Sequence, residues 1–217
     1  MPHRVHAPRI AVTLLAATLC ACGDASGPAA TTLHDLPADG VVRVRDCTGP
    51  ATSVDPRRVP SPPSDPRQRS SDDAFAQLVR TVPGGIAGVY LEQPSGAVVL
   101  LMTDTARAAD ARRALANQFS GVDMARARPR PARWSFVQLY DWSRWLFAND
   151  AWTLGGSTGG ASAVTMFDID ERENRLVFGV TDTTARRRVA AALARLELPC
   201  DLVQVLVRPP AVILPAR

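Results

Sequence analysis

The segment LGGSTGG, residues 154–160, contains a G-x-S-x-G pattern that would place Ser157 as the nucleophile of a hydrolase. A serine hydroxyl attacks at neutral pH only when a base, usually histidine or lysine, lies within hydrogen-bond reach. The histidines are His3, His6 and His34, and all 25 basic residues are arginine, which stays protonated in proteins. We therefore expect Ser157 to lie in a flexible Gly/Ser loop, with no catalytic residue and no enzymatic activity.

Asp168 and Asp170 form a second pair of residues that could do chemistry, either as acid–base groups or as calcium ligands. In a strand, both carboxylates would lie on the face opposite Phe167 and Ile169. A calcium loop would need a third oxygen ligand at the position that Arg172 occupies. We interpret the pair as a solvated strand face next to a hairpin turn, and we expect neither a metal nor a cofactor.

The N-terminus has the pattern of a bacterial lipoprotein signal peptide. Arg4 and Arg9 precede the apolar stretch Ile10–Ala21, which is too short for a stop-transfer helix. The stretch ends in LCACG, which resembles a lipobox with Cys22 as the residue that receives the lipid, palmitate among its chains. An ordinary signal peptide and an uncut anchor are the alternatives. We expect a lipid-anchored protein of the cell envelope, in the outer membrane if the source is Gram-negative, because Gly23 rather than aspartate follows the cysteine.

Removal of residues 1–21 would leave 23 basic and 21 acidic residues, so that the formal net charge falls from +4 to +2. The run of Arg126, Arg128, Arg130 and Arg133 could contact phosphates or acidic lipid head groups. Its prolines and its alternation favour a solvated connector. We expect no nucleic-acid partner.

Cys47 and Cys200 are the remaining cysteines outside the signal region. An isolated pair in an exported protein is more often bonded than free, and no histidine lies near either residue to complete a metal site. We predict one disulfide between them, closing a loop of more than a hundred residues. Loop-closure entropy then stabilises the fold by on the order of 4 kcal/mol as an upper value.

The first quarter of the mature chain reads as a tether and a linker around one short strand. Residues 22–40 are rich in Ala, Gly, Ser, Thr and Pro, and we predict a flexible tether there. Valines before Cys47 predict a short strand over residues 41–47. Residues 48–73 have prolines every few positions and few apolar side chains, which predicts an extended, partly disordered linker.

The globular part contains an internal repeat. Residues 88–115 align without a gap on residues 166–193, at an offset of 78, and the motif Thr-Asp-Thr recurs at 103–105 and 181–183. Each copy alternates as a strand, turns on a polar stretch, resumes as a strand and then offers an N-cap to an Ala/Arg-rich helix. A helix with the pattern F-x-Q-L, at Phe75 and at Phe136, precedes each hairpin.

The run GIAGVYLEQPSGAVVLLMTDTARAADARRAL and the later run NRLVFGVTDTTARRRVAAAL resemble the pro-segment domains of the alpha-lytic-protease group of secreted bacterial serine proteases. Those domains have an aromatic-containing strand, a turn, an L-V-V strand, a T-D-A-A motif and an Ala-rich helix. The resemblance covers residues 74–207 and implies an α+β module that acts as folding template or inhibitor of an exported protease. Residues 208–217 stand here where the family has its catalytic domain.

Tryptophans gather around the second upstream helix, ARWSFVQLYDWSRWLF. At helical spacing, Trp134, Trp142 and Trp145 fall on a face other than that of Phe136 and Leu139. A helix that is apolar on two sides is usually buried between neighbours, which we favour. The alternative is an exposed partner-binding surface formed by Trp134, Trp142 and Trp145.

The sequence thus predicts an α+β fold with two tandem helix–hairpin–helix repeats packed side by side. Repeat 1 (αββα) covers 74–131, repeat 2 (αββαβ) covers 132–207, and a tail follows. We expect a non-catalytic envelope lipoprotein whose prodomain-like module binds a protein, with an exported protease as candidate partner. The alternative is a ligand- or polymer-binding lipoprotein that uses the tryptophan helix and the loop at 155–160.

Overall fold

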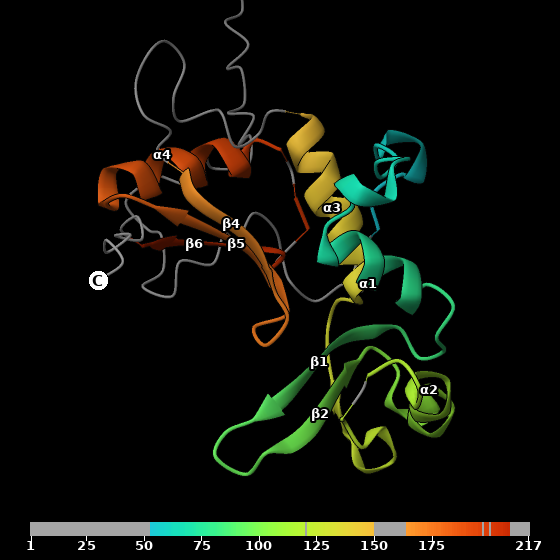
Figure 1. Ribbon diagram of the computed structural model, residues 1–217. Coiled ribbons are helices and arrows are strands. Elements are labelled where there is room, and N and C mark those ends of the chain that lie inside the picture. Colours follow the sequence, from blue (N-terminus) through green and yellow to red (C-terminus); the bar gives the residue numbers. More distant parts are fainter. Residues whose placement is uncertain (1–52, 120, 150–163, 197, 200, 209–217) are drawn as a thin grey trace, which may run out of the picture. The chain divides into compact units, whose positions relative to one another are not determined.

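The computed structural model describes residues 53–119, 121–149, 164–196, 198, 199 and 201–208, and within them the chain is α+β. Four α-helices accompany two three-stranded sheets in this described part (Figure 1). None of the helices found there has the length and apolar character needed to cross a bilayer.

The helices are α1 (Ser71–Val79), α2 (Ala108–Leu115), α3 (Phe136–Ala148) and α4 (Thr183–Ala194). The strands are β1 (Ile86–Glu92), β2 (Ala97–Met102) and β3 (Arg128–Pro131) in one sheet, and β4 (Val164–Asp170), β5 (Arg175–Val180) and β6 (Val203–Val207) in the other.

The two sheets have the same strand order and the same pairing. In each, an antiparallel hairpin is extended by a third strand that runs parallel to the second strand of the hairpin. Ile86 pairs with Met102 and Val164 pairs with Val180, so both partners recur 78 residues later. An irregularity after the first residue of β1 recurs at the same place in β4. The tandem repeat itself remains a prediction, and what the structure adds is this common register.

The arginine–proline run was expected to be a connector and is instead strand β3, although all four of its residues are exposed. The backbone N–H of Ala132 donates to Met102 O, at 2.9 Å, at the end of this pairing. In a parallel strand, alternate residues direct their backbone N–H and C=O groups to the same neighbouring strand. Because Ala132 N points to β2, the backbone groups of Arg128 and Arg130 do so too, while those of Pro129 and Pro131 point away. A proline has no N–H to offer, and it therefore suits the outer side of an edge strand. This assignment gives the first half a trailing strand that the predicted αββα unit lacked.

Local hydrogen bonds explain where the helices begin. Asp182 accepts from Ala185 N at 2.8 Å and caps α4, as the Thr-Asp-Thr motif predicts. In the first half, Asp104 caps a short 3₁₀ turn, Thr105–Arg107, which continues into α2. Figure 1 shows α4 lying along the sheet formed by β4, β5 and β6.

The helices before the hairpins, α1 and α3, both begin with a capping box. Ser70 and Asp73 form it in α1, and Ser135 and Gln138 form it in α3. The shared F-x-Q-L pattern does not mark equivalent positions, because Phe136 is the first residue of α3 whereas Phe75 is the fifth of α1. The two rings instead meet edge to face, with their centroids 4.6 Å apart.

Residues 53–70, predicted as part of an extended linker, pack along α3. Arg144 donates to Pro60 O at 2.9 Å and to Ser61 O at 2.7 Å, and Val54 is buried in the main core. Two 3₁₀ turns, Pro56–Arg58 and Pro66–Gln68, are each capped by an aspartate that precedes a proline. Two carbonyl groups of this segment thus accept hydrogen bonds from a side chain of α3, an outcome that composition alone does not reveal.

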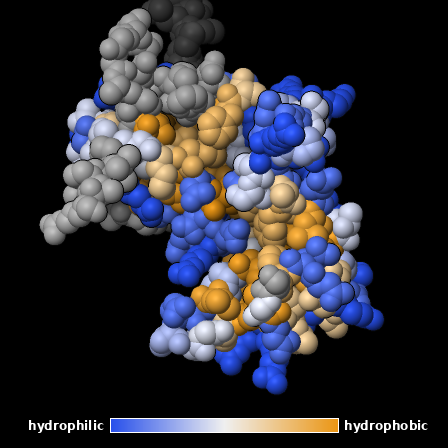
Figure 2. Space-filling model, viewed as in Figure 1, coloured by the Kyte–Doolittle hydropathy of each residue, from blue (hydrophilic) through white to orange (hydrophobic). Residues whose placement is uncertain are grey.

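Buried side chains of both sheets belong to one contiguous core, in which Leu100 and Phe178 are fully buried. A small second cluster, which includes Val99 and Leu101, lies on the other face of the first sheet. Successive side chains of β2 point to opposite faces of the sheet, and those on both faces are buried. In the view of Figure 2, hydrophobic side chains also reach the surface over α3.

Candidate functional site

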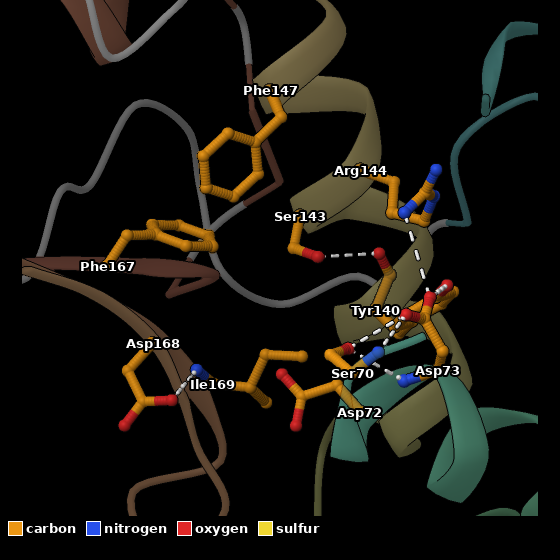
Figure 3. A pocket seen from close by; sticks show the side chains of 10 residues that line it. All are labelled: Ser70, Asp72, Asp73, Tyr140, Ser143, Arg144, Phe147, Phe167, Asp168 and Ile169. Carbon is orange, nitrogen blue, oxygen red and sulfur yellow. Dashed lines mark hydrogen bonds and ion pairs between the residues drawn. The ribbon is translucent and has the colours of Figure 1, made fainter. Parts of the chain in front are cut away.

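A recess of about 230 Å³ lies where α1, α3 and β4 meet (Figure 3). α1 and its N-cap contribute only polar side chains to its wall, whereas α3 and β4 each contribute polar and apolar ones. The lining residues are Ser70, Asp72, Asp73, Tyr140, Ser143, Arg144, Phe147, Phe167, Asp168 and Ile169.

One side of the recess is aromatic and partly exposed. The Phe147 side chain, in the last turn of α3, is 45% exposed, and its ring meets that of Phe167 edge to face with centroids 4.7 Å apart. Phe167 in turn contacts the buried ring of Phe178, also at 4.7 Å. Because side chains alternate along a strand, Phe167 and Ile169 point to the same face of β4. The exposed ring is therefore held in place by a stack of contacts that reaches the core.

The opposite side contains a buried polar network around Asp73, whose side chain is only 6% exposed. Its Oδ2 accepts from Ser70 N at 2.6 Å and from Ser70 Oγ at 2.9 Å, and its Oδ1 accepts from the Tyr140 hydroxyl. The Arg144 Nη1 atom lies 3.7 Å from Asp73 Oδ1. The N-terminal cap of α1 is thereby tied to the middle of α3.

The network shifts the pKa values of its two acids, Asp73 and Tyr140. Burial acts to raise the pKa of Asp73, but hydrogen bonds from Tyr140 and Ser70, with Arg144 nearby, outweigh it and lower the pKa overall. Burial, followed by the hydrogen bond to Asp73, raises the pKa of Tyr140 to about 12. Asp73 is thus ionised and Tyr140 neutral at ordinary pH. A pair with pKa values moved away from neutrality is suited to holding two helices together and not to proton transfer.

The remaining carboxylates of the recess are Asp72 and Asp168, and Figure 3 shows the Ile169 side chain between them. The Oδ1 atom of Asp168 accepts from Ile169 N at 2.9 Å. Burial and then the neighbouring charges of Asp168 and Asp73 raise the pKa of Asp72. Within the part of the chain that the structure describes, neither Asp72 nor Asp168 forms an ion pair. The recess therefore offers negative charge beside aromatic surface.

Asp168 and Asp170, the carboxylates that the sequence places as a pair, differ in their exposure to solvent. Asp168 is exposed at the recess, as a solvated strand face predicts, whereas Asp170 is half-buried and its Oδ1 accepts from Glu173 N at 2.9 Å. Among the described residues no cluster of three His, Cys, Asp or Glu side chains has an arrangement that could hold a metal ion.

Two of the three tryptophans that could form a partner surface are buried. Trp134 is fully buried and Trp142 is buried, while Trp145 is half-buried, with its ring 5.4 Å from that of Trp142. The exposed surface formed by all three residues, which was the alternative interpretation, is therefore wrong. The physical reason is that α3 packs against both sheets and so needs two apolar faces.

Several predicted residues lie outside the described part of the chain. They are Cys22 with its lipid, the proposed disulfide partners Cys47 and Cys200, and Ser157 with its loop at 155–160. The predictions made for them therefore stay predictions.

The residues that line the recess from α1 are absent from the sites predicted from the sequence. The S-x-x-D pattern of Ser70 and Asp73 is a recognisable N-cap signal, and it could have placed the start of α1 at residue 71. No local pattern connects Asp73 with Tyr140, which is 67 positions away. Comparison with protein-family models gives no match for this chain, and comparison with curated proteins gives none either.

Proposed function

We propose that this protein is a non-catalytic, membrane-anchored lipoprotein of the cell envelope whose α+β module binds another protein. The resemblance to protease pro-segments makes an exported protease the first partner to test, in a template-like or inhibitor-like role. The observation that supports protein binding is the recess. Its aromatic side lies next to two carboxylates, Asp72 and Asp168, that form no ion pair with any residue that the structure describes.

The lipid anchor rests on the lipobox LCACG and its flanks. Cys22→Ala is expected to abolish incorporation of labelled palmitate into the full chain, because the thiol that receives the lipid is gone. Cys20→Ala is the matched control, since it removes a thiol two positions away and should leave labelling intact. Labelling that survives Cys22→Ala would remove the anchor from the proposal.

The chemistry of the recess indicates what a partner segment must supply. Phe147 and Phe167 offer ring surface to an apolar side chain or to a guanidinium group. Asp72 and Asp168 disfavour each other's charge, and an incoming arginine or lysine would relieve that repulsion. A partner segment that presents a cationic side chain next to an apolar one meets both requirements.

Site-specific photo-crosslinking in the native envelope tests this assignment. A benzophenone amino acid replaces Phe147 in the full chain, and the matched control replaces Leu91, an exposed apolar residue of β1. We expect a protein adduct from position 147 and not from position 91. The double variant Asp72→Asn/Asp168→Asn should lower the yield of that adduct several-fold. Equal yields from both positions, or a yield that ignores the two carboxylates, would contradict binding at the recess.

A further inference from the structure

The turn between β4 and β5 lies against the first strand of the other sheet. A Cβ atom on Gly88 of β1 would come within 2.8 Å of both Cβ and Oε2 of Glu171, so the glutamate occupies the space next to this glycine. The Glu171 carboxyl also accepts a hydrogen bond from the backbone of Val89. One residue further on, the guanidinium carbon of Arg172 lies 5.1 Å from the centre of the Tyr90 ring.

The same turn is held from a second side by Asn174. Its side-chain amide accepts from Trp134 N at 2.7 Å and donates to Trp134 O at 2.8 Å. Trp134 is fully buried, so this bridge fixes the C-terminal end of the turn. The N-terminal end depends on Glu171, which is half-buried.

The charges that face Glu171 have the same sign as its own. Asp72 comes from the first turn of α1, and Asp168 and Asp170 come from β4. From β1 the group that reaches it is the backbone of Val89, while Tyr90 carries Arg172 on its ring. An ionised Glu171 would therefore be a fourth carboxylate beside three others, in a half-buried contact.

We propose that the contact between the β4–β5 turn and β1 is controlled by a proton on Glu171. With the proton bound, the neutral carboxyl group lies against Gly88 and Val89 without repulsion. When the proton is lost, the turn opens at this end while the bridge from Asn174 to Trp134 stays in place. The contact thus responds to the pH of the compartment that the module faces, and it does not depend on the proposed protein partner.

The direction of the effect follows from the acid's two environments. Burial, and then the neighbouring carboxylates, raises the pKa of Glu171 from 4.5 to about 7 in the closed contact. A carboxyl with a raised pKa holds its proton more tightly when closed than when open. The contact is therefore strongest below about pH 4.5, weakens as the pH rises to about 7, and stays weak above that.

Hydrogen exchange of the full-length protein tests the proposal. The Val89 amide is resolved by fragmentation mass spectrometry, and its protection factor is corrected for intrinsic base catalysis. We expect protection at Val89 to fall roughly 50-fold between pH 5 and pH 7.5. Glu171→Gln, which keeps the shape and cannot ionise, should make that protection constant within twofold.

Two further variants keep the test specific. Glu173→Gln removes an exposed carboxylate from the same turn and should behave as the natural protein does. Asp72→Asn removes one of the negative charges that raise the pKa of Glu171. In this variant the fall in protection at Val89 should therefore be complete at a lower pH than in the natural protein. Protection in the natural protein that does not change with pH, or the same change in Glu171→Gln, overturns the proposal.

Discussion

Gly96 in the first hairpin and Asn174 in the second occupy the same place, the last position of a four-residue turn, and both have a left-handed backbone with φ of 66° and 54°. A Cβ at Gly96 would meet nothing within 4 Å, because this turn is exposed. Asn174 makes two hydrogen bonds to the backbone of Trp134. The same left-handed position thus ends an exposed turn in the first half, whereas in the second half it ties the turn to the residue just before the N-cap of α3. The second turn also contacts β1 of the first sheet through Glu171 and Arg172, so the two turns differ in several side chains and in what surrounds them.

The third strands show the same contrast. β3 has the sequence RPRP and is exposed throughout, whereas Val203 and Val205 of β6 are buried. Ala132 N donates to Met102 O after β3, and Arg208 N donates to Val180 O after β6, at 2.9 and 2.8 Å. The pairing is therefore alike although only β6 buries apolar surface. A third strand thus pairs in parallel in both halves, with buried apolar side chains in the second half and without them in the first.

The largest expected effect tests whether the halves share one core. Leu100 and Phe178 hold the same register position, and both are fully buried. We expect Leu100→Ala to lower the free energy of unfolding by about 2–5 kcal/mol and Phe178→Ala by about 3–5 kcal/mol. Chemical denaturation followed by tryptophan fluorescence and circular dichroism should show one transition for each variant. Two separate transitions would mean that the halves unfold independently.

The next effect concerns the helices that precede the hairpins. Asp73 closes a capping box and also accepts from Tyr140 on α3, so Asp73→Asn should cost about 2 kcal/mol at pH 7. Gln138→Ala in the corresponding box of α3 should cost about 1 kcal/mol.

The pH dependence of Asp73→Asn sharpens this comparison. Because the folded pKa of Asp73 is lowered, its contribution is complete above the ordinary carboxyl pKa and is lost as the pH falls through the folded pKa. The stabilities of the variant and the natural protein, measured by urea denaturation, should therefore converge in acid. A constant difference down to pH 2 would contradict the proposed charge network.

Exchanging the two turn residues breaks the comparison of the hairpins directly. Asn174→Gly keeps the left-handed backbone but leaves the buried N–H and C=O of Trp134 without partners, which should cost about 1–3 kcal/mol. Gly96→Asn places a tolerated residue in open space and should change stability by less than about 1 kcal/mol. Thermal unfolding of both variants measures the difference. Equal losses would show that the backbone conformation, and not the bridge to Trp134, determines the cost.

The smallest effect belongs to β3. Arg130 pairs with Glu92 of β1 on the surface, and both side chains are partly exposed. Arg130→Gln should therefore cost less than about 1 kcal/mol, and added salt should reduce the difference further. A loss above 2 kcal/mol in the same denaturation assay would show that the strand depends on this ion pair.

Local sequence patterns were sufficient for the α+β class, the two hairpins and the cap of α4. The polar stretches 94–96 and 171–174 mark the turns, and Asp182 lies one position before its helix, because turn and cap chemistry act over a few neighbouring residues. The alternation of arginine and proline at 128–131 was also readable as an edge strand. The prolines and the alternation of the run favoured a connector instead, because neither pattern shows which strand would pair with it.

Tertiary structure alone decided where the distant polar groups meet. Asp73 contacts Tyr140 across 67 positions, and Asp72 on α1 approaches Asp168 of β4 and Glu171 of the turn that follows it. No local rule specifies such pairs, since they depend on how α1 and α3 pack against β4. The same packing buried Trp134 and Trp142 and ordered residues 53–70 along α3. Sequence determined the elements because their signals are local, and packing determined the recess because its charges come from elements that are far apart in the chain.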